Sequence, residues 1–440
     1  MTLLAAASAV DITPPIGTPL DGYSGRNDVA LGIHDSLYAR CLLLDDGASR
    51  IALIVCDLIG VGEFLAERAR ALIAERPGVP AENVLIAATH THAGPAGVRG
   101  RGDETLVDSI ARKIAGAALT ASLALRPVAL KYGTTSLESI AQNRRDPAWP
   151  IDTRLDVLAI DTPEGRNIAT VARYSCHATT MERNNLLVSA DYPGAACATI
   201  EQVVGHNTTA LFFNGCCGNV NPTWIRQEFD DMRRVGTVVG ATAAALSQQL
   251  RPQGVNHQAH NIRWNELTEK PVNAGRLVPE MPLQAARRPF EAPYRSGPPD
   301  AEMATLIADL SRQREAATTV QERRRISESL TRAQGERTAL QRIAGRGPAR
   351  TEEVQAFRLG AGFYLLGLPG EVFVETQEEI RARSGIDDLV VVAYANDYPG
   401  YFCRPEAYDQ GGYEAGVTPF APEADGRLVE AALAVLEEVR

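Results

Sequence analysis

A strand–helix–strand pattern near the N-terminus does most to limit the folds open to this chain. Apolar residues at 51–57 and 84–92 are typical of buried strands, and residues 64–75 are typical of a helix that ends before Pro77 and Gly78. Two strands joined through a helix pair in parallel, and a parallel sheet is covered by helices. The pattern therefore predicts an α/β fold.

The same alternation of strands and helices recurs along the chain. Helices are expected at 106–125, 195–204, 235–250 and 426–439, and strands at 128–132, 156–160, 168–176, 210–213, 354–359, 363–368 and 389–395. Together these elements predict a mixed, largely parallel sheet covered by helices.

The composition changes between residues 267 and 347, where Pro-rich and Arg/Glu/Gln-rich stretches replace strand patterns. Residues 301–314 and 319–342 are typical of two long polar helices. Because the sheet pattern returns afterwards, we predict one domain over residues 1–440 with a helical hairpin inserted at 267–347. A charged hairpin is most often a solvated surface feature, but it could also form a homo-oligomer contact or a flap over a site.

Composition excludes several classes of function. The 440 residues are 45% hydrophobic with a formal net charge of −10, which fits a globular protein and argues against a nucleic-acid-binding surface. We expect no membrane span, because no stretch of eighteen residues is uninterruptedly apolar, and no cleaved signal peptide, because a basic n-region is missing. Seven scattered cysteines indicate a reducing compartment and predict a cytoplasmic protein.

Two histidines lie where the second strand of the opening pattern ends. His90 and His92 are two residues apart, so an extended strand would turn both to one face, and Gly94 and Pro95 follow directly. Open α/β sheets bind ligands at this carboxyl edge. The pair indicates a metal site, or a metal ligand beside an acid/base group; the alternative is core histidines bonded to backbone.

Further polar residues are expected at the same edge. His177 ends another apolar strand, and Glu371 follows a strand and opens a helix. Zinc catalysis needs three or four N/O ligands with an open position, which a carboxylate would help to complete. The glycine-rich loop at 214–222 could bring Asn219 and Asn221 to a substrate, and residues 394–413 gather several tyrosines.

The motifs together resemble a known family, the neutral/alkaline non-lysosomal ceramidases, over their N-terminal catalytic domain. The matching motifs are Asp11-Ile12-Thr13, Gly32-Ile33-His34, the run from His90 to Pro95, Asn143-Arg144, His177-Ala178-Thr179-Thr180-Met181, Gly218-Asn219-Val220-Asn221-Pro222, Pro369-Gly370-Glu371, and residues 396–414. The His-Thr-His stretch and the tyrosine-rich run are the most specific.

The resemblance implies a zinc amidohydrolase. The metal ligands of the family fall here on His90, His177, Glu371 and Tyr401. His92 falls on a group that acts on the leaving amine or the tetrahedral intermediate, and Arg144 and Tyr413 fall on positions that orient or stabilise the carbonyl.

Departures from the family pattern bear on the substrate. Asn219 and Asn221 replace an Asp and a Ser of the family, and no counterpart of its C-terminal immunoglobulin-like domain is expected. Arginines in the inserted segment suit carboxylates or phosphates better than hydrocarbon. We therefore expect a zinc-dependent hydrolase of a C–N amide bond that acts on a small soluble amide. The alternatives are an ester or lactone hydrolase, a true ceramidase, and a catalytically silent metal-containing binding protein.

Overall fold

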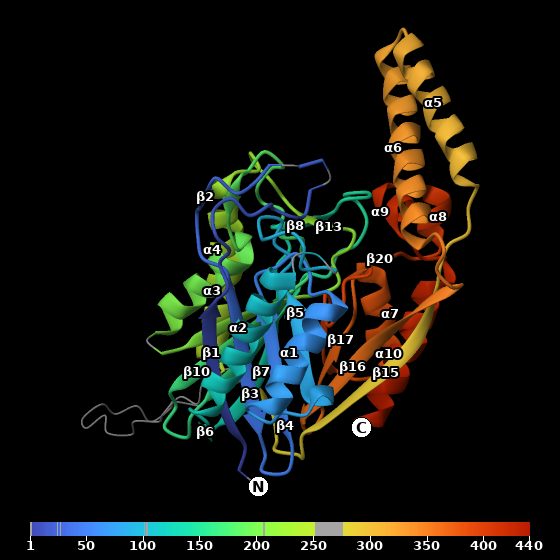
Figure 1. Cartoon of the computed structure of the whole chain (residues 1–440). Helices are drawn as coiled ribbons and strands as arrows, with labels where there is room; N and C mark the ends of the chain where they lie inside the picture. The colour runs from blue at the N-terminus through green and yellow to red at the C-terminus, as the bar shows by residue number, and fades with distance from the viewer. Residues whose placement is uncertain are drawn as a thin grey trace, which may run out of the picture.

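Three β-sheets form the body of the molecule in the computed structural model (Figure 1). The structure describes residues 2–440 except 24, 27, 101, 103, 206 and 251–275. The predicted insertion therefore falls outside the described residues over 267–275.

The first sheet contains the predicted strand–helix–strand unit. Its strands are β1 (Leu4–Asp11), β3 (Tyr38–Asp45), β4 (Arg50–Cys56), β5 (Val84–Ala88) and β6 (Arg126–Pro127), in the order β5-β4-β3-β1-β6. Helix α1 (Glu63–Glu75) leads from β4 to β5, and these two strands pair in parallel, which confirms the prediction. Helix α2 (Glu104–Ser122) packs on the same sheet.

The second and third sheets carry the remaining helices. The second contains β7 (Ala129–Ser136), β9 (Arg154–Asp161), β10 (Asn167–Tyr174), β12 (Thr209–Asn214) and β14 (Arg276–Leu277), with α3 (Asp191–Val204) and α4 (Phe229–Gln249) packed against it. The third contains β15 (Gln284–Pro293), β16 (Ala349–Gly360), β17 (Phe363–Gly367) and β19 (Asp388–Val392), with α10 (Glu423–Glu438) against it and α7 (Val374–Ser384) against α10.

Side-chain alternation divides the core into two parts. In β4, Leu53 and Val55 face an apolar cluster shared with residues of the other two sheets, whereas Ile54 and Cys56 belong to the cluster that includes helix residues. Because strand side chains alternate between faces, one run of apolar residues fills both layers. This explains why the strand sequences are continuously hydrophobic.

The mixed α/β fold is as expected, but two details differ. The strands form several sheets, and among the described strands antiparallel pairs outnumber parallel ones, because short turns at 46–49, 162–166 and 361–362 connect successive strands as hairpins. Strand β15 also forms inside the segment predicted to lack strands. Among the described strands it pairs with β16 alone, and such an edge position tolerates Pro289 and exposed charges.

The helices α5 (Asp300–Ala316) and α6 (Val320–Ile343) project from the body beside α8 (Glu406–Gln410) and α9 (Tyr413–Val417) (Figure 1). Thr319 begins α6 by accepting a 3.1 Å hydrogen bond from the backbone N–H of Glu322. Within the described part of the chain, no helix combines the length and the apolar composition that crossing a membrane requires.

Candidate metal centre

The predicted site residues lie at strand ends of the first two sheets and in a separate two-stranded sheet. His90 lies just beyond β5, and His177 lies just beyond β10. Glu371 belongs to the short strand β18 (Glu371–Val372), which pairs in parallel with β20 (Tyr401–Phe402), so that Glu371 stands opposite Tyr401. The strand ends thus bring four distant segments of the chain to one place.

The histidine pair reaches this place through a turn rather than through strand alternation. Strand β5 ends at Ala88, and His90 adopts a left-handed backbone conformation with φ of 67°. The backbone N–H of His92 then bonds the Ala178 carbonyl at 3.3 Å, which ties the pair to the segment that carries His177. The strand predicted over 84–92 is therefore shorter, but both imidazoles still face the site.

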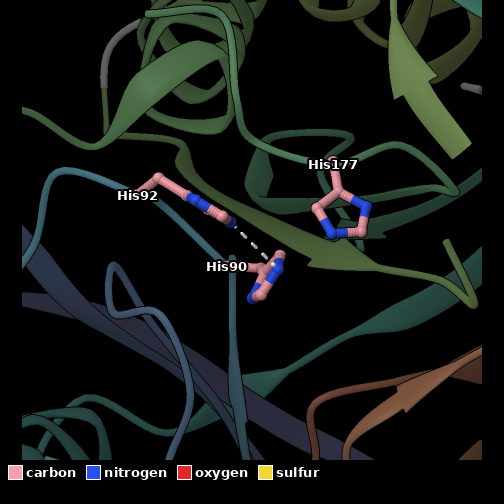
Figure 2. Close-up of side chains that lie close together, drawn as sticks. All are labelled: His90, His92 and His177. Atoms are coloured by element: carbon pink, nitrogen blue, oxygen red, sulfur yellow. Dashed lines mark hydrogen bonds between the residues drawn. The ribbon is translucent and has the colours of Figure 1, made fainter. Parts of the chain in front are cut away.

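Three imidazoles converge at the centre of the site (Figure 2). The Nε2 atoms of His90 and His92 are 3.3 Å apart, and ligating atoms of His90, His92 and His177 all lie within 4.8 Å of one another. His90 and His177 are fully buried, and His92 is half-buried. Such a cluster of nitrogen atoms is suited to hold a transition metal.

Backbone carbonyls fix the tautomers of the two buried histidines. Nδ1 of His90 donates to the Ile59 carbonyl at 2.6 Å, and Nδ1 of His177 donates to the Cys217 carbonyl at 2.6 Å. Each imidazole therefore turns Nε2 toward the site, the orientation that a ligating histidine needs. Burial and the nearby Arg144 lower the pKa of His177 to about 4, which keeps this ring neutral.

Glu371 places a carboxylate between these nitrogens. Its Oε2 lies 3.1 Å from Nε2 of His177 and 3.4 Å from Nε2 of His90, and its Oε1 accepts the Tyr398 hydroxyl. Burial alone would raise the pKa of Glu371, but the two histidines hold it well below its usual range. Gly370 makes this placement possible, because a Cβ there would approach the Gly400 carbonyl to 2.4 Å.

Arg144 connects the site to its tyrosines. Its guanidinium donates to the Tyr401 hydroxyl at 3.1 Å and to Glu414 at 2.6 Å, and it lies within 6.0 Å of the ring centres of both Tyr401 and Tyr413. Tyr401 is buried, whereas Tyr413 is 51% exposed. Burial and Glu371 raise the pKa of Tyr401 well above its usual value, although Arg144 opposes this.

The chain packs closely around His92. Arg26 donates to the His92 carbonyl at 2.6 Å, and the Tyr23 ring meets the imidazole edge-on at 4.8 Å. Gly22 has φ of 108°, and a Cβ there would lie 2.6 Å from Cγ of His92. Burial and the other two histidines lower the pKa of His92 well below its usual value.

The two predicted substrate-binding asparagines differ in position. Asn221 lines the cavity above the site, 3.5 Å from the Arg144 guanidinium. Asn219 is fully buried, and its side chain bonds the Val374 N–H at 3.0 Å and Glu375 at 2.8 Å, so it is committed to the start of α7. The loop at 214–222 otherwise contributes backbone carbonyls that orient His177.

Several residues at the site were not singled out from the sequence. Tyr398 bonds Glu371, Glu414 pairs with Arg144, and Gly22 shapes the space beside His92. The tyrosine-rich run offered a signal for Tyr398. Glu414 ends the run 396–414 that carried the resemblance. Gly22 had no signal, because it acts through a contact with a segment that is distant in sequence.

A cavity of about 1150 Å³ opens above the centre. Its inner wall includes His92, Arg144, Glu371, Tyr401 and Tyr413. Its outer wall is one side of α6, so the projecting hairpin forms part of the space in front of the site.

Two known proteins are similar to this chain over most of its length. The neutral ceramidase of Pseudomonas aeruginosa is 27% identical over 456 aligned residues, which cover 91% of this chain and 66% of that protein. The neutral ceramidase of Mycobacterium tuberculosis is 26% identical, with 91% of this chain and 71% of that protein covered. This chain therefore spans about two thirds of the length of these relatives.

Structural comparison gives the same fold. The crystal structure of the Pseudomonas aeruginosa neutral ceramidase superposes with a TM-score of 0.75 at 23% identity, covering 100% of this chain and 75% of that one. Residues 4–263 match the family model described as neutral/alkaline non-lysosomal ceramidase, N-terminal. With more than half of its residues matched, the chain belongs to the neutral/alkaline non-lysosomal ceramidase family.

Proposed function

We propose that the protein is a zinc-dependent hydrolase of a C–N amide bond. The observation that carries this proposal is the convergence of the His90 and His177 Nε2 atoms on the Glu371 carboxylate, with both Nδ1 atoms donating to backbone carbonyls. Two imidazoles, a carboxylate and the nearby Tyr401 phenol form a donor set that fits zinc. Membership of the ceramidase family supports the choice of an amide bond.

The residues around this donor set have complementary roles in the proposed reaction. A zinc ion held there supplies Lewis acidity and lowers the pKa of water. Arg144 and Tyr413 orient the substrate carbonyl and stabilise negative charge on its oxygen. His92 would accept the proton that the attacking water loses and pass it to the leaving nitrogen. Water is thereby added across the C–N bond, and the products are a carboxylic acid and an amine.

We further propose a small soluble amide as the substrate. The outer wall of the cavity consists of polar and charged α6 residues rather than an apolar channel for lipid chains. We also propose that the reaction takes place in the cytoplasm, because all seven cysteines are buried and unpaired. Hydrolysis of ceramide itself is the second candidate, and the names of the relatives favour it.

One substrate series tests these proposals. Purified protein, with and without added zinc, is assayed on short N-acyl amides, on matched esters, and on long-chain ceramide in detergent micelles. We expect zinc-dependent cleavage of the short amides at a higher kcat/KM than of ceramide. Faster cleavage of ceramide would establish the second candidate, faster cleavage of esters would identify an esterase, and a zinc-saturated protein inactive on all three would refute hydrolysis.

A further inference from the structure

The side of α6 that faces the cavity is a mostly polar stripe. Its members are spaced three or four residues apart, so they share one helix face: Arg324, Glu328, Thr331, Gly335, Thr338 and Arg342. The buried apolar residues Ile326, Leu330 and Ala333 lie on the opposite side of the helix. The polarity of this cavity wall is therefore a feature of the folded hairpin and not a stretch of merely solvated helix.

Most positive charges along the cavity are already neutralised. Arg99 pairs with Asp21 at 2.5 Å, and Arg324 pairs with Glu328 at 3.2 Å. Arg144 pairs with Glu414, as described above. A substrate anion would have to compete with these carboxylates for each guanidinium.

Arg342 is different. It lines the cavity from the last turn of α6, and it makes no hydrogen bond or ion pair with any residue that the structure describes. Its positive charge, with that of Arg144, opposes the burial that raises the pKa of Tyr413, so the guanidinium lies near this tyrosine. Tyr413 in turn meets the Tyr401 ring at 6.0 Å.

Arg332 shows what a structural arginine on this helix looks like. Its guanidinium bonds the Tyr408 carbonyl at 3.4 Å and lies 3.1 Å from the position that a Cβ on Gly411 would take. It therefore joins α6 to α8 and to the loop before α9. Arg342 makes no such contact with the residues that the structure describes, so its N–H donors are available to a ligand.

We infer that Arg342 binds an anionic group of the amide substrate and so determines specificity. This inference rests on the proposed function and deepens it: the substrate is an N-acyl compound that carries a carboxylate or phosphate away from the scissile bond. A guanidinium binds either oxyanion through paired N–H donors. The polar stripe beside it offers hydroxyl groups to such a ligand and little apolar contact to a hydrocarbon chain.

The test compares short N-acyl amides that share one scissile bond and end in a carboxylate, a phosphate or a neutral methyl ester. We expect wild-type protein to prefer one of the anionic substrates by about tenfold in kcat/KM. In Arg342→Gln this preference should vanish through a higher KM, with the neutral substrate unaffected. Arg342→Glu should instead favour a substrate that ends in an amine, a reversal that a purely structural role would not produce.

Arg312→Gln is the matched control. Arg312 is an exposed arginine of α5 that pairs with Asp309 and lies outside the cavity lining. This variant should keep the wild-type preference. Equal kcat/KM for charged and neutral amides in wild-type protein, or an unchanged preference in Arg342→Gln, would overturn the inference while leaving amide hydrolysis intact.

A binding measurement separates the two proposals if no amide is cleaved. Glutarate and inorganic phosphate are titrated calorimetrically into zinc-loaded wild type and Arg342→Gln. Weaker binding of either anion by about tenfold in the variant would support the inference although the proposed function had failed. Equal binding of both anions would overturn the inference as well.

Discussion

Substituting Tyr398 by phenylalanine should weaken zinc binding without removing any proposed ligand. The Tyr398 hydroxyl donates to Oε1 of Glu371, while Oε2 of the same carboxylate faces the two buried histidines. The phenylalanine ring would keep the packing of Tyr398 against His90, at a ring separation of 5.9 Å, and against Tyr394 at 6.3 Å. The substitution therefore isolates one hydrogen bond.

The size of the effect follows from the burial of Glu371. A hydrogen bond to a charged group contributes about 1.5–3 kcal/mol. Loss of an outer partner of a metal ligand usually weakens metal affinity by about 10- to 100-fold. At about 1.4 kcal/mol per tenfold, the two ranges agree, so we expect the zinc Kd of Tyr398→Phe to rise by about 10- to 100-fold.

Competition with a chromogenic zinc chelator measures this change. Tyr408→Phe is the matched control, because the Tyr408 hydroxyl donates to the Phe420 carbonyl at 2.9 Å and does not contact the proposed ligands. The control should bind zinc as wild type does. An unchanged Kd in Tyr398→Phe, or an equal loss in both variants, would show that Glu371 does not hold zinc in the way proposed.

Three further predictions concern neighbouring groups. His90→Ala should lose zinc, measured by elemental analysis. His92→Ala should keep zinc, and its turnover should fall by about two to four decades. Loss of zinc from both variants would show that His92 is a ligand. Gly22→Ala should retain zinc but lower turnover, because the added Cβ would press on His92. Gly47 is also left-handed, at φ of 86°, but has no neighbouring atom in the way, so Gly47→Ala should affect stability alone. Equal turnover of the two variants would refute the steric argument. Burial raises the pKa of Asp231, but three backbone N–H bonds and Arg234 lower it to about 2. The ionised carboxylate therefore stabilises the fold above its ordinary pKa of 3.8, and this stabilisation is lost as the pH falls toward 2. Denaturant curves of wild type and Asp231→Asn should differ by about 2 kcal/mol at pH 7 and converge only as the pH reaches about 2. A difference independent of pH would contradict this.

The strands next to the site were predictable because local patterns dominate there. Apolar runs fixed β4, β5 and β12 to within a few residues, and glycine and proline marked the end of β5. Strands β1 and β3 were not predicted, although β1 pairs with β3 along its whole length. The alanine-rich β1 has low strand propensity, so tertiary pairing and not local preference makes it a strand.

In the proposed ligand set, His90, His177 and Glu371 were expected at one sheet edge from the residue pattern, and Tyr401 came only from the resemblance. The contacts that support this set were not predictable. His90 and His92 were expected on one face of a strand, but the left-handed conformation of His90 creates their convergence. The Ile59 and Cys217 carbonyls that set the two tautomers belong to backbone, which leaves no trace in residue identity. Contacts of this kind depend on register between distant segments.

Anomalous X-ray scattering at the zinc absorption edge, from crystals of zinc-saturated protein, tests the account most directly. The account predicts one strong peak about 2.0–2.2 Å from Nε2 of His90, Nε2 of His177 and a Glu371 carboxylate oxygen, with the Tyr401 hydroxyl beside it. A zinc peak at any other place in the chain, with this donor set left empty, would contradict it.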